Sequence, residues 1–330
     1  MVDPNRLWRG AVNEIAPGVW YLPIVMANVY FIGEKNGPWV LVDAGVRGGC
    51  WRIRQAAMDT FGQAPECIVL THGHFDHVGG LPQLAQEWNV PVYAHAMETP
   101  FLNGSSDYPP PDPTVGGFMA QMSRLFPHGG IDLGIHLRTL PEDGTVPGIN
   151  GWRWIHTPGH TSGHVSLFRE DDRSLIAGDA VITVNQENAA KLMTQLREFR
   201  NPPRYLTQDW AAARRSVERL AELRPNMVAT GHGLPVGGNW VPDELERFAA
   251  NFTAPDHGRY VNTPVRADEY GILYVPPAPP DPMPMYAAGV GLAAAAGLLM
   301  VAANRRKKGQ ETTSEVAANY DKYRRDGFRD

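Results

Sequence analysis

Three histidines and an aspartate lie within six consecutive residues of this 330-residue chain, and this segment constrains its fold and chemistry more than any other. The apolar residues 67–70 precede it and predict a short buried strand, while Gly79 and Gly80 mark a tight exit. The polar side chains are therefore expected on one loop at the end of a strand. Imidazole nitrogen and carboxylate oxygen are good ligands for a metal such as zinc. The residues are His72, His74, Asp76 and His77.

The spacing within this segment favours two neighbouring metal sites. His72 and His74 are two positions apart, so on an extended chain their side chains point the same way. Asp76 and His77 are adjacent, and their side chains diverge. This divergence suits a second ion beside the first.

The pattern His-x-His-x-Asp-His resembles the signature of the metallo-β-lactamase fold superfamily, and the other motifs of that family follow in order. Asp43 lies in Val-Asp-Ala-Gly, and His160 lies in Thr-Pro-Gly-His-Thr-Ser-Gly. Asp179 lies in Ala-Gly-Asp-Ala, and His232 lies in Thr-Gly-His-Gly. The residues by themselves predict an α/β protein with two sheets. The resemblance implies the four-layer αββα sandwich of the family.

The resemblance also implies a dinuclear metal site, with two Zn²⁺ ions or, alternatively, iron or manganese. Asp43 is implied as a carboxylate that orients a ligand histidine. A hydroxide bridging the ions would attack an ester, thioester or lactone carbonyl, and Asp76 or Asp179 would take up the proton. The implied ligands are His72, His74 and His160 for one ion, Asp76, His77 and His232 for the other, and Asp179 between the two.

Departures from known subfamilies narrow this expectation. Asp179 stands where the commonest zinc β-lactamases carry a cysteine, which argues against antibiotic hydrolysis. Ile182 stands where acyl-homoserine lactonases carry a tyrosine, and the basic glutathione-binding residues of glyoxalase II-type thioesterases are not evident. We therefore expect a metallo-hydrolase of the glyoxalase II-like or lactonase-like branch. A mononuclear iron enzyme resembling persulfide dioxygenases and a membrane-tethered binding protein without turnover remain as alternatives.

Composition restricts the partners. The chain is 43% hydrophobic with a net charge of −5, which argues against a nucleic-acid partner and leaves a small-molecule substrate. Cys50 and Cys67 are expected to be reduced thiols. Residues 1–10 lack the apolar core of a signal peptide, so a cytoplasmic catalytic domain is expected. The sequence leaves the oligomeric state open.

The C-terminal third predicts a membrane anchor. Residues 1–256 are predicted to form the catalytic domain, and residues 257–284 a Pro-rich linker. Residues 285–303 are uncharged and precede four basic residues, which favours a single transmembrane helix, since a span needs about 20 residues. An Ala-rich helix docked on the domain or on a partner is the alternative. Residues 304–330 form a charged tail.

Hydrophobic patterns predict the regular elements. Two long segments, 102–130 and 182–207, lack such patterns and are predicted to recognise the substrate. Tyr108 and Tyr205 within them are candidate hydrogen-bond donors to an oxyanion that develops during the reaction. Strands are predicted at 18–22, 28–32, 38–42, 67–70, 91–94, 152–156, 165–169 and 174–177, and helices at 48–61, 81–88, 209–223 and 242–252.

Overall fold

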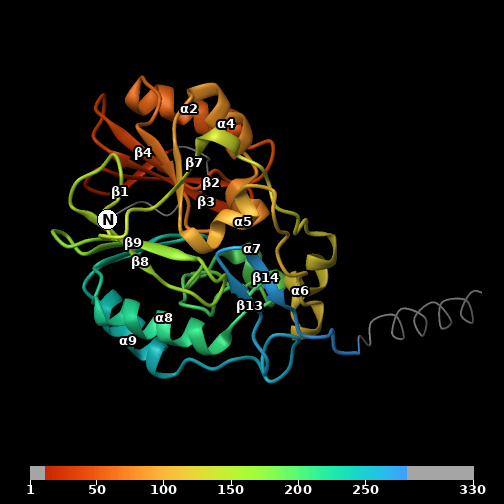
Figure 1. Ribbon diagram of the computed structural model, residues 1–330. Coiled ribbons are helices and arrows are strands. Elements are labelled where there is room, and N and C mark those ends of the chain that lie inside the picture. Colours follow the sequence, from red (N-terminus) through yellow and green to blue (C-terminus); the bar gives the residue numbers. More distant parts are fainter. Residues whose placement is uncertain (1–11, 281–330) are drawn as a thin grey trace, which may run out of the picture. The chain divides into compact units, whose positions relative to one another are not determined.

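The computed structural model describes residues 12–280, which form two packed β-sheets with helices on both outer faces, the predicted sandwich (Figure 1). The first sheet has the order β1 (Asn13–Ala16), β2 (Val19–Ile24), β3 (Ala27–Gly33), β4 (Trp39–Val42), β5 (Cys67–Val69), β6 (Val92–Ala94) and β7 (Leu137–Thr139). The second has the order β12 (Val236–Gly237), β11 (Met227–Thr230), β10 (Ser174–Gly178), β9 (Val165–Arg169) and β8 (Trp152–His156). A separate hairpin pairs β13 (Arg266–Asp268) with β14 (Gly271–Tyr274).

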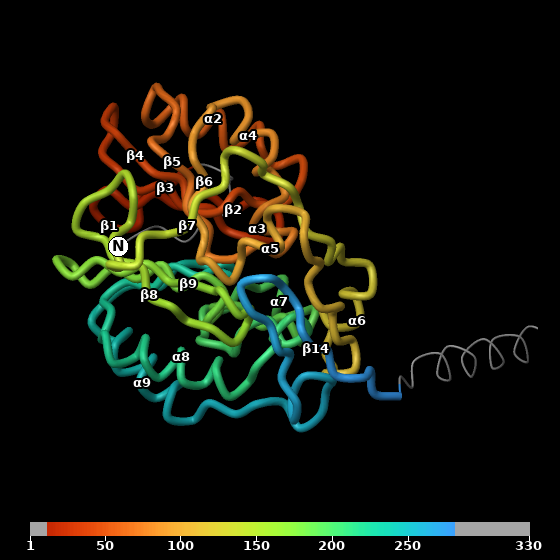
Figure 2. The backbone as a smooth tube through the Cα atoms, in the orientation of Figure 1, coloured from red at the N-terminus to blue at the C-terminus, as the bar shows by residue number. Residues whose placement is uncertain are grey.

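The longer helices cover the sheets, and the shorter ones lie in the loops. The first sheet packs against α2 (Cys50–Phe61) and α4 (Leu81–Trp88), and the second against α8 (Trp210–Glu222) and α9 (Val241–Ala250). Figure 2 shows the earlier part of the chain, red to yellow, around the first sheet and the later part, green to blue, around the second. The short helices are α3 (Phe75–Val78), α5 (Thr99–Leu102), α6 (Phe118–Met122) and α7 (Ala189–Thr194).

Alternating side chains on the strands explain the layers. Val19 and Tyr21 of β2 belong to the core between the sheets, whereas Trp20 belongs to the core under α2 and α4. In β9, Leu167 faces the first sheet and Phe168 faces α8 and α9. Successive residues of a strand point to opposite faces of the sheet. Apolar residues at both odd and even positions therefore bury both faces of each sheet.

Parallel strands bring the motif residues to one edge. β4, β5 and β6 run parallel in the first sheet, and β10 and β11 run parallel in the second. Asp43 follows β4, His72 comes shortly after β5, and Asp179 and His232 follow β10 and β11. Since the carboxyl ends of parallel strands lie at the same edge of a sheet, the topology collects these residues where the two sheets meet.

The predicted linker at 257–284 is wrong in part, because β13 and β14 form a hairpin within it. The segment before the hairpin is held by the sandwich, where the Tyr260 hydroxyl donates to the Pro110 carbonyl over 2.6 Å. The compact unit accordingly extends beyond residue 256, to Pro279. Groups of this segment form hydrogen bonds with the catalytic domain. The segment therefore belongs to that domain.

The predicted strands, helices, membrane span and tail have different outcomes. The predicted strands and helices are all present within a few residues of their expected bounds, whereas β1, β7, β11 and β12 were not predicted. The predicted membrane span at 285–303 and the tail at 304–330 lie outside the described residues. Between residues 12 and 280, none of the helices has the length and apolar character needed to cross a membrane.

Candidate metal centre

The loop after β5 places the first four polar residues. His72 and His74 precede α3, and Asp76 and His77 lie within it. The turn that follows packs tightly on the chain after β4, because a Cβ at Gly79 would overlap the backbone nitrogen of Arg47. All four polar side chains are buried. The loop is therefore held closely against the sheet edge.

The seven predicted ligands converge in the structure. Asp179 lies between the two predicted sets, with Oδ2 at 3.1 Å from His232 Nε2, 3.4 Å from His160 Nε2 and 3.6 Å from His77 Nε2. Among the described residues, three groups have ligand atoms that all lie within 4.8 Å of one another. They are His72 with His74 and His160, His72 with His77 and Asp179, and Asp76 with His77 and His232.

Asp43 supports two of these histidines from the end of β4. Its Oδ2 lies 2.8 Å from His77 Nδ1 and accepts from the Thr71 hydroxyl at 2.8 Å, while its Oδ1 accepts from the Thr71 N–H at 2.8 Å. Because the Thr71 hydroxyl donates to Asp43, it accepts from His72 Nδ1–H over 3.1 Å. Asp43 thus holds both rings with Nε2 directed to the cluster, the role expected for it.

Two further histidines also direct Nε2 to the cluster. His232 Nδ1–H donates to the Met26 carbonyl over 2.7 Å. His160 Nδ1 lies 3.4 Å from Thr207 Oγ1, whose own proton goes to a backbone carbonyl. In both rings Nε2 is left for a metal ion. His74 differs, since its Nδ1 lies 2.9 Å from His160 Nε2 and is the atom that faces the cluster.

Unpartnered buried atoms show that the site fits metal ions. Among the described residues, His72 Nε2, Asp76 Oδ1, His77 Nε2 and Asp179 Oδ1 are buried and have no hydrogen-bond partner. Leaving polar atoms buried without partners costs free energy, so native proteins normally satisfy them. These atoms belong to the residues that converge in the cluster. Divalent ions would satisfy them together.

The charges of the cluster suit metal binding. Burial lowers the pKa of His74 to about 3 and that of His160 well below its ordinary value. Burial alone would raise the pKa of Asp179, but positive charge on His232 and His77 outweighs it and holds that pKa well below the usual range. Against the lowering effect of burial, the Asp179 carboxylate raises the pKa of His77 and His232, so an ion bound there would displace protons from these two rings, as metal binding to histidine does.

Glu98 is a buried residue of this site that the sequence analysis missed. Its Oε2 accepts from the Gly73 N–H at 3.0 Å and from the Tyr108 hydroxyl. Its Oε1 accepts from the Thr161 hydroxyl at 2.6 Å and from the Gly163 N–H at 3.0 Å. Glu98 therefore ties the loop after β5 to the loop that carries the third histidine of the first set. The missed signal was its position after β6, the next parallel strand.

The two candidate tyrosines have different outcomes. The prediction that Tyr108 donates to a developing oxyanion is wrong, because its hydroxyl donates to Glu98 and accepts from the Gly73 N–H. Tyr205 is buried, and its ring lies 5.7 Å from that of Phe126. Its role as a donor stays a prediction.

His164 lies beside the cluster without joining it. Its Nε2 accepts from the Asp179 N–H at 2.9 Å, so in the neutral ring Nδ1 carries the proton and donates to the Thr157 hydroxyl over 2.8 Å. Both ring nitrogens are therefore used. His164 positions the backbone of Asp179.

Gly231 supplies a test of this geometry. A methyl group there would overlap Asp179 Oδ1 and lie 2.8 Å from His77 Cε1. We expect Gly231→Ala to displace both side chains and to weaken metal binding by about tenfold or more, as measured by metal titration. Gly237→Ala, whose added Cβ makes only ordinary contacts in β12, is the matched control. Wild-type metal affinity in Gly231→Ala would contradict the arrangement.

Comparison with known proteins agrees with these motifs. Residues 22–232 match the family model described as the metallo-beta-lactamase superfamily. The chain is 46% identical over 258 residues to the probable metallo-hydrolase YflN of Bacillus subtilis (strain 168), covering 76% of this chain and 98% of that protein. It is 27% identical over 116 residues to the hydroxyacylglutathione hydrolase GloC of Haemophilus influenzae, covering 34% and 49%. A crystal structure of TTHA1623 in a di-iron-bound form is 26% identical, with a TM-score of 0.46 and coverage of 66% and 92%.

Proposed function

From the premise that this chain belongs to the metallo-β-lactamase superfamily, we propose that it is a dinuclear zinc hydrolase of ester, thioester or lactone bonds. The observation that carries the proposal is the convergence of two ligand sets, with Asp179 close to members of both. A pair of divalent ions held there supplies a hydroxide near neutral pH and polarises the carbonyl oxygen.

The residues of the cluster take separate parts in this proposal. His72, His74 and His160 would hold one ion, Asp76, His77 and His232 would hold the other, and Asp179 would be shared by the two. In the reaction a water oxygen bonds to the carbonyl carbon and the bond to the leaving oxygen or sulfur breaks. Asp76 or Asp179 would accept the water proton and return it to the leaving group.

Metal content and turnover test the proposal together. We expect the purified full-length protein to contain two zinc ions per chain by elemental analysis. It should hydrolyse members of an ester, thioester and lactone panel, and a chelator should abolish turnover and lower the unfolding temperature. One iron per chain with oxygen uptake on persulfides would instead indicate an iron dioxygenase. Bound metal with no turnover of either panel would indicate a binding protein.

Attachment of the catalytic unit to a membrane by residues 285–303 stays a prediction from the sequence. Removing residues 281–330 leaves the compact unit, which ends at Pro279. We expect this truncation to move the protein from the membrane fraction to the soluble fraction without changing turnover. A full-length protein that fractionates like the truncated one would remove the anchor.

A further inference from the structure

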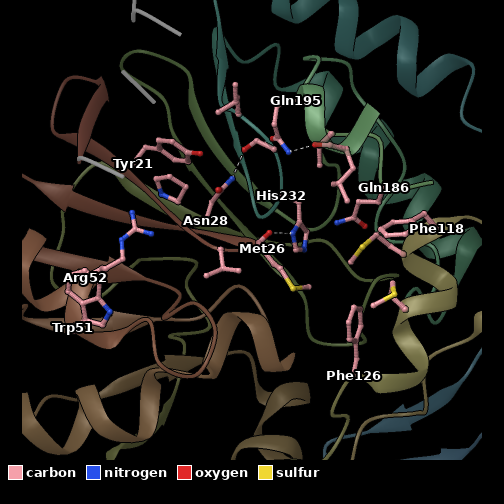
Figure 3. Close-up of a pocket in the computed structure, with 18 residues that line it drawn as sticks. Tyr21, Met26, Asn28, Trp51, Arg52, Phe118, Phe126, Gln186, Gln195 and His232 are labelled. Atoms are coloured by element: carbon pink, nitrogen blue, oxygen red, sulfur yellow. Dashed lines mark hydrogen bonds between the residues drawn. The ribbon is translucent and has the colours of Figure 1, made fainter. Parts of the chain in front are cut away.

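A cavity of about 780 Å³ lies beside the metal centre, with His232 in its wall (Figure 3). Both segments predicted to recognise the substrate contribute to it, the first through α6 and the second through α7 and the residues before it. The turn after β2 closes another side. The apolar part of the lining includes Val25, Met26, Phe118, Met119, Met122 and Leu192.

Most polar groups in this wall already have partners inside the protein. Asn28 Nδ2 donates to the carbonyls of Thr230 and Gly233, over 2.8 Å and 2.6 Å. Gln195 Nε2 donates to the Leu192 carbonyl over 2.8 Å. As far as residues 12–280 show, the lining contains no carboxylate and no lysine, and its one arginine, Arg52, already has an interaction of its own. The wall therefore offers few groups to pair with a charged substrate, whose burial without partners is costly.

Gln186 is the exception. Its side chain lines the cavity and only 8% of the residue is exposed, yet its Oε1 has no hydrogen-bond partner. Figure 3 shows the Gln186 amide directed toward His232. Its backbone carbonyl accepts from the Met119 N–H over 3.1 Å, which holds the residue against α6. This buried oxygen can only accept a hydrogen bond, so it needs an N–H or O–H donor, which a bound substrate next to the metal centre would supply.

The apolar surface continues to the mouth of the cavity. Trp51 is 62% exposed and Phe118 is 43% exposed, although both are large apolar residues of the lining. Exposed apolar groups that rim a concave apolar site are typical of ligand binding. Covering them with a ligand removes apolar area from water, which is favourable.

We propose that this cavity binds the uncharged, medium-length aliphatic acyl chain of the substrate, with Gln186 Oε1 accepting a hydrogen bond from an N–H or O–H beside the scissile carbonyl. This assignment rests on the proposed hydrolase function and deepens it. The chain lies along Phe118 and Met122, and the carbonyl lies at the metal centre next to His232. Esters and thioesters of short or charged acyl groups leave the apolar wall uncovered.

A chain-length series tests the assignment. With the metal-loaded full-length protein, we expect kcat/KM for p-nitrophenyl esters to rise from acetyl to octanoyl by about threefold to fourfold for each added methylene. In the double variant Phe118→Ala, Met122→Ala, the ratio of octanoyl to acetyl kcat/KM should fall by about tenfold. Gln186→Leu should instead weaken the binding of a primary amide, whose N–H can donate to Oε1, because p-nitrophenyl esters have no such donor. Met58→Ala, an exposed methionine on α2 away from the cavity, is the matched control and should change neither.

A binding measurement separates this inference from the hydrolase proposal. Octanamide should bind the full-length protein in calorimetry, and the double variant should weaken its binding by about tenfold. If octanamide binds in this way while no ester, thioester or lactone is hydrolysed, the hydrolase proposal fails and the acyl cavity stands. If esters are hydrolysed without dependence on chain length and octanamide does not bind, the acyl cavity is overturned and the hydrolase stands.

Discussion

Replacing Asp179 with alanine is expected to lower ester turnover by at least about 100-fold, because one carboxylate oxygen lies close to histidines of both ligand sets. In the proposed dinuclear site, this substitution removes the shared ligand. We expect metal content to fall from two ions to one or fewer per chain by elemental analysis. The folded state should persist, since the backbone of residue 179 still donates to His164.

Asp171→Ala is the control for this prediction. Asp171 is an exposed aspartate in the turn between β9 and β10, so its loss should change neither metal content nor turnover. Circular dichroism of both variants checks the fold. If Asp179→Ala kept wild-type turnover with two bound ions, the shared-ligand role would be wrong.

Replacing Glu98 with alanine is expected to lower the free energy of unfolding by about 3 to 5 kcal/mol, because four buried donors lose this acceptor, although the Gly73 N–H keeps the Tyr108 hydroxyl. The loops that it joins carry histidines of the first ligand set. We therefore also expect metal affinity to fall by about 10-fold to 100-fold. Denaturant unfolding and metal titration measure the two effects.

A second variant keeps this prediction testable if Glu98→Ala does not fold. Glu98→Gln retains the shape but turns one acceptor into a donor, so it should fall between wild type and alanine in both measurements. Glu87→Ala is the control, since Glu87 forms a surface ion pair with Arg54 at 2.9 Å that contributes less than about 1 kcal/mol. Equal unfolding midpoints for wild type and Glu98→Gln would show that the carboxylate does not hold the loops together.

The strands and helices were predictable where a long pattern repeats. The buried strands β2, β3 and β4 are largely continuous apolar runs and the helices α2 and α8 show a helical period, and the structure has all five near the expected bounds. The hairpin of β13 and β14 was not predictable, because its surroundings are rich in proline and its position depends on contacts such as that of Tyr260 with Pro110. Local pattern does not encode such distant contacts.

The sequence by itself determined the ligand types and the spacing of His72, His74, Asp76 and His77, because these lie on one short loop whose geometry follows from adjacent residues. Together with the ordered motifs, this also determined the family. Only the tertiary structure decided that Glu98 joins the loops and that an apolar cavity with Gln186 in its wall adjoins His232. These features join segments far apart in the chain. Strand pairing and the packing of the layers bring these segments together. Neither can be predicted from the local spacing of residues.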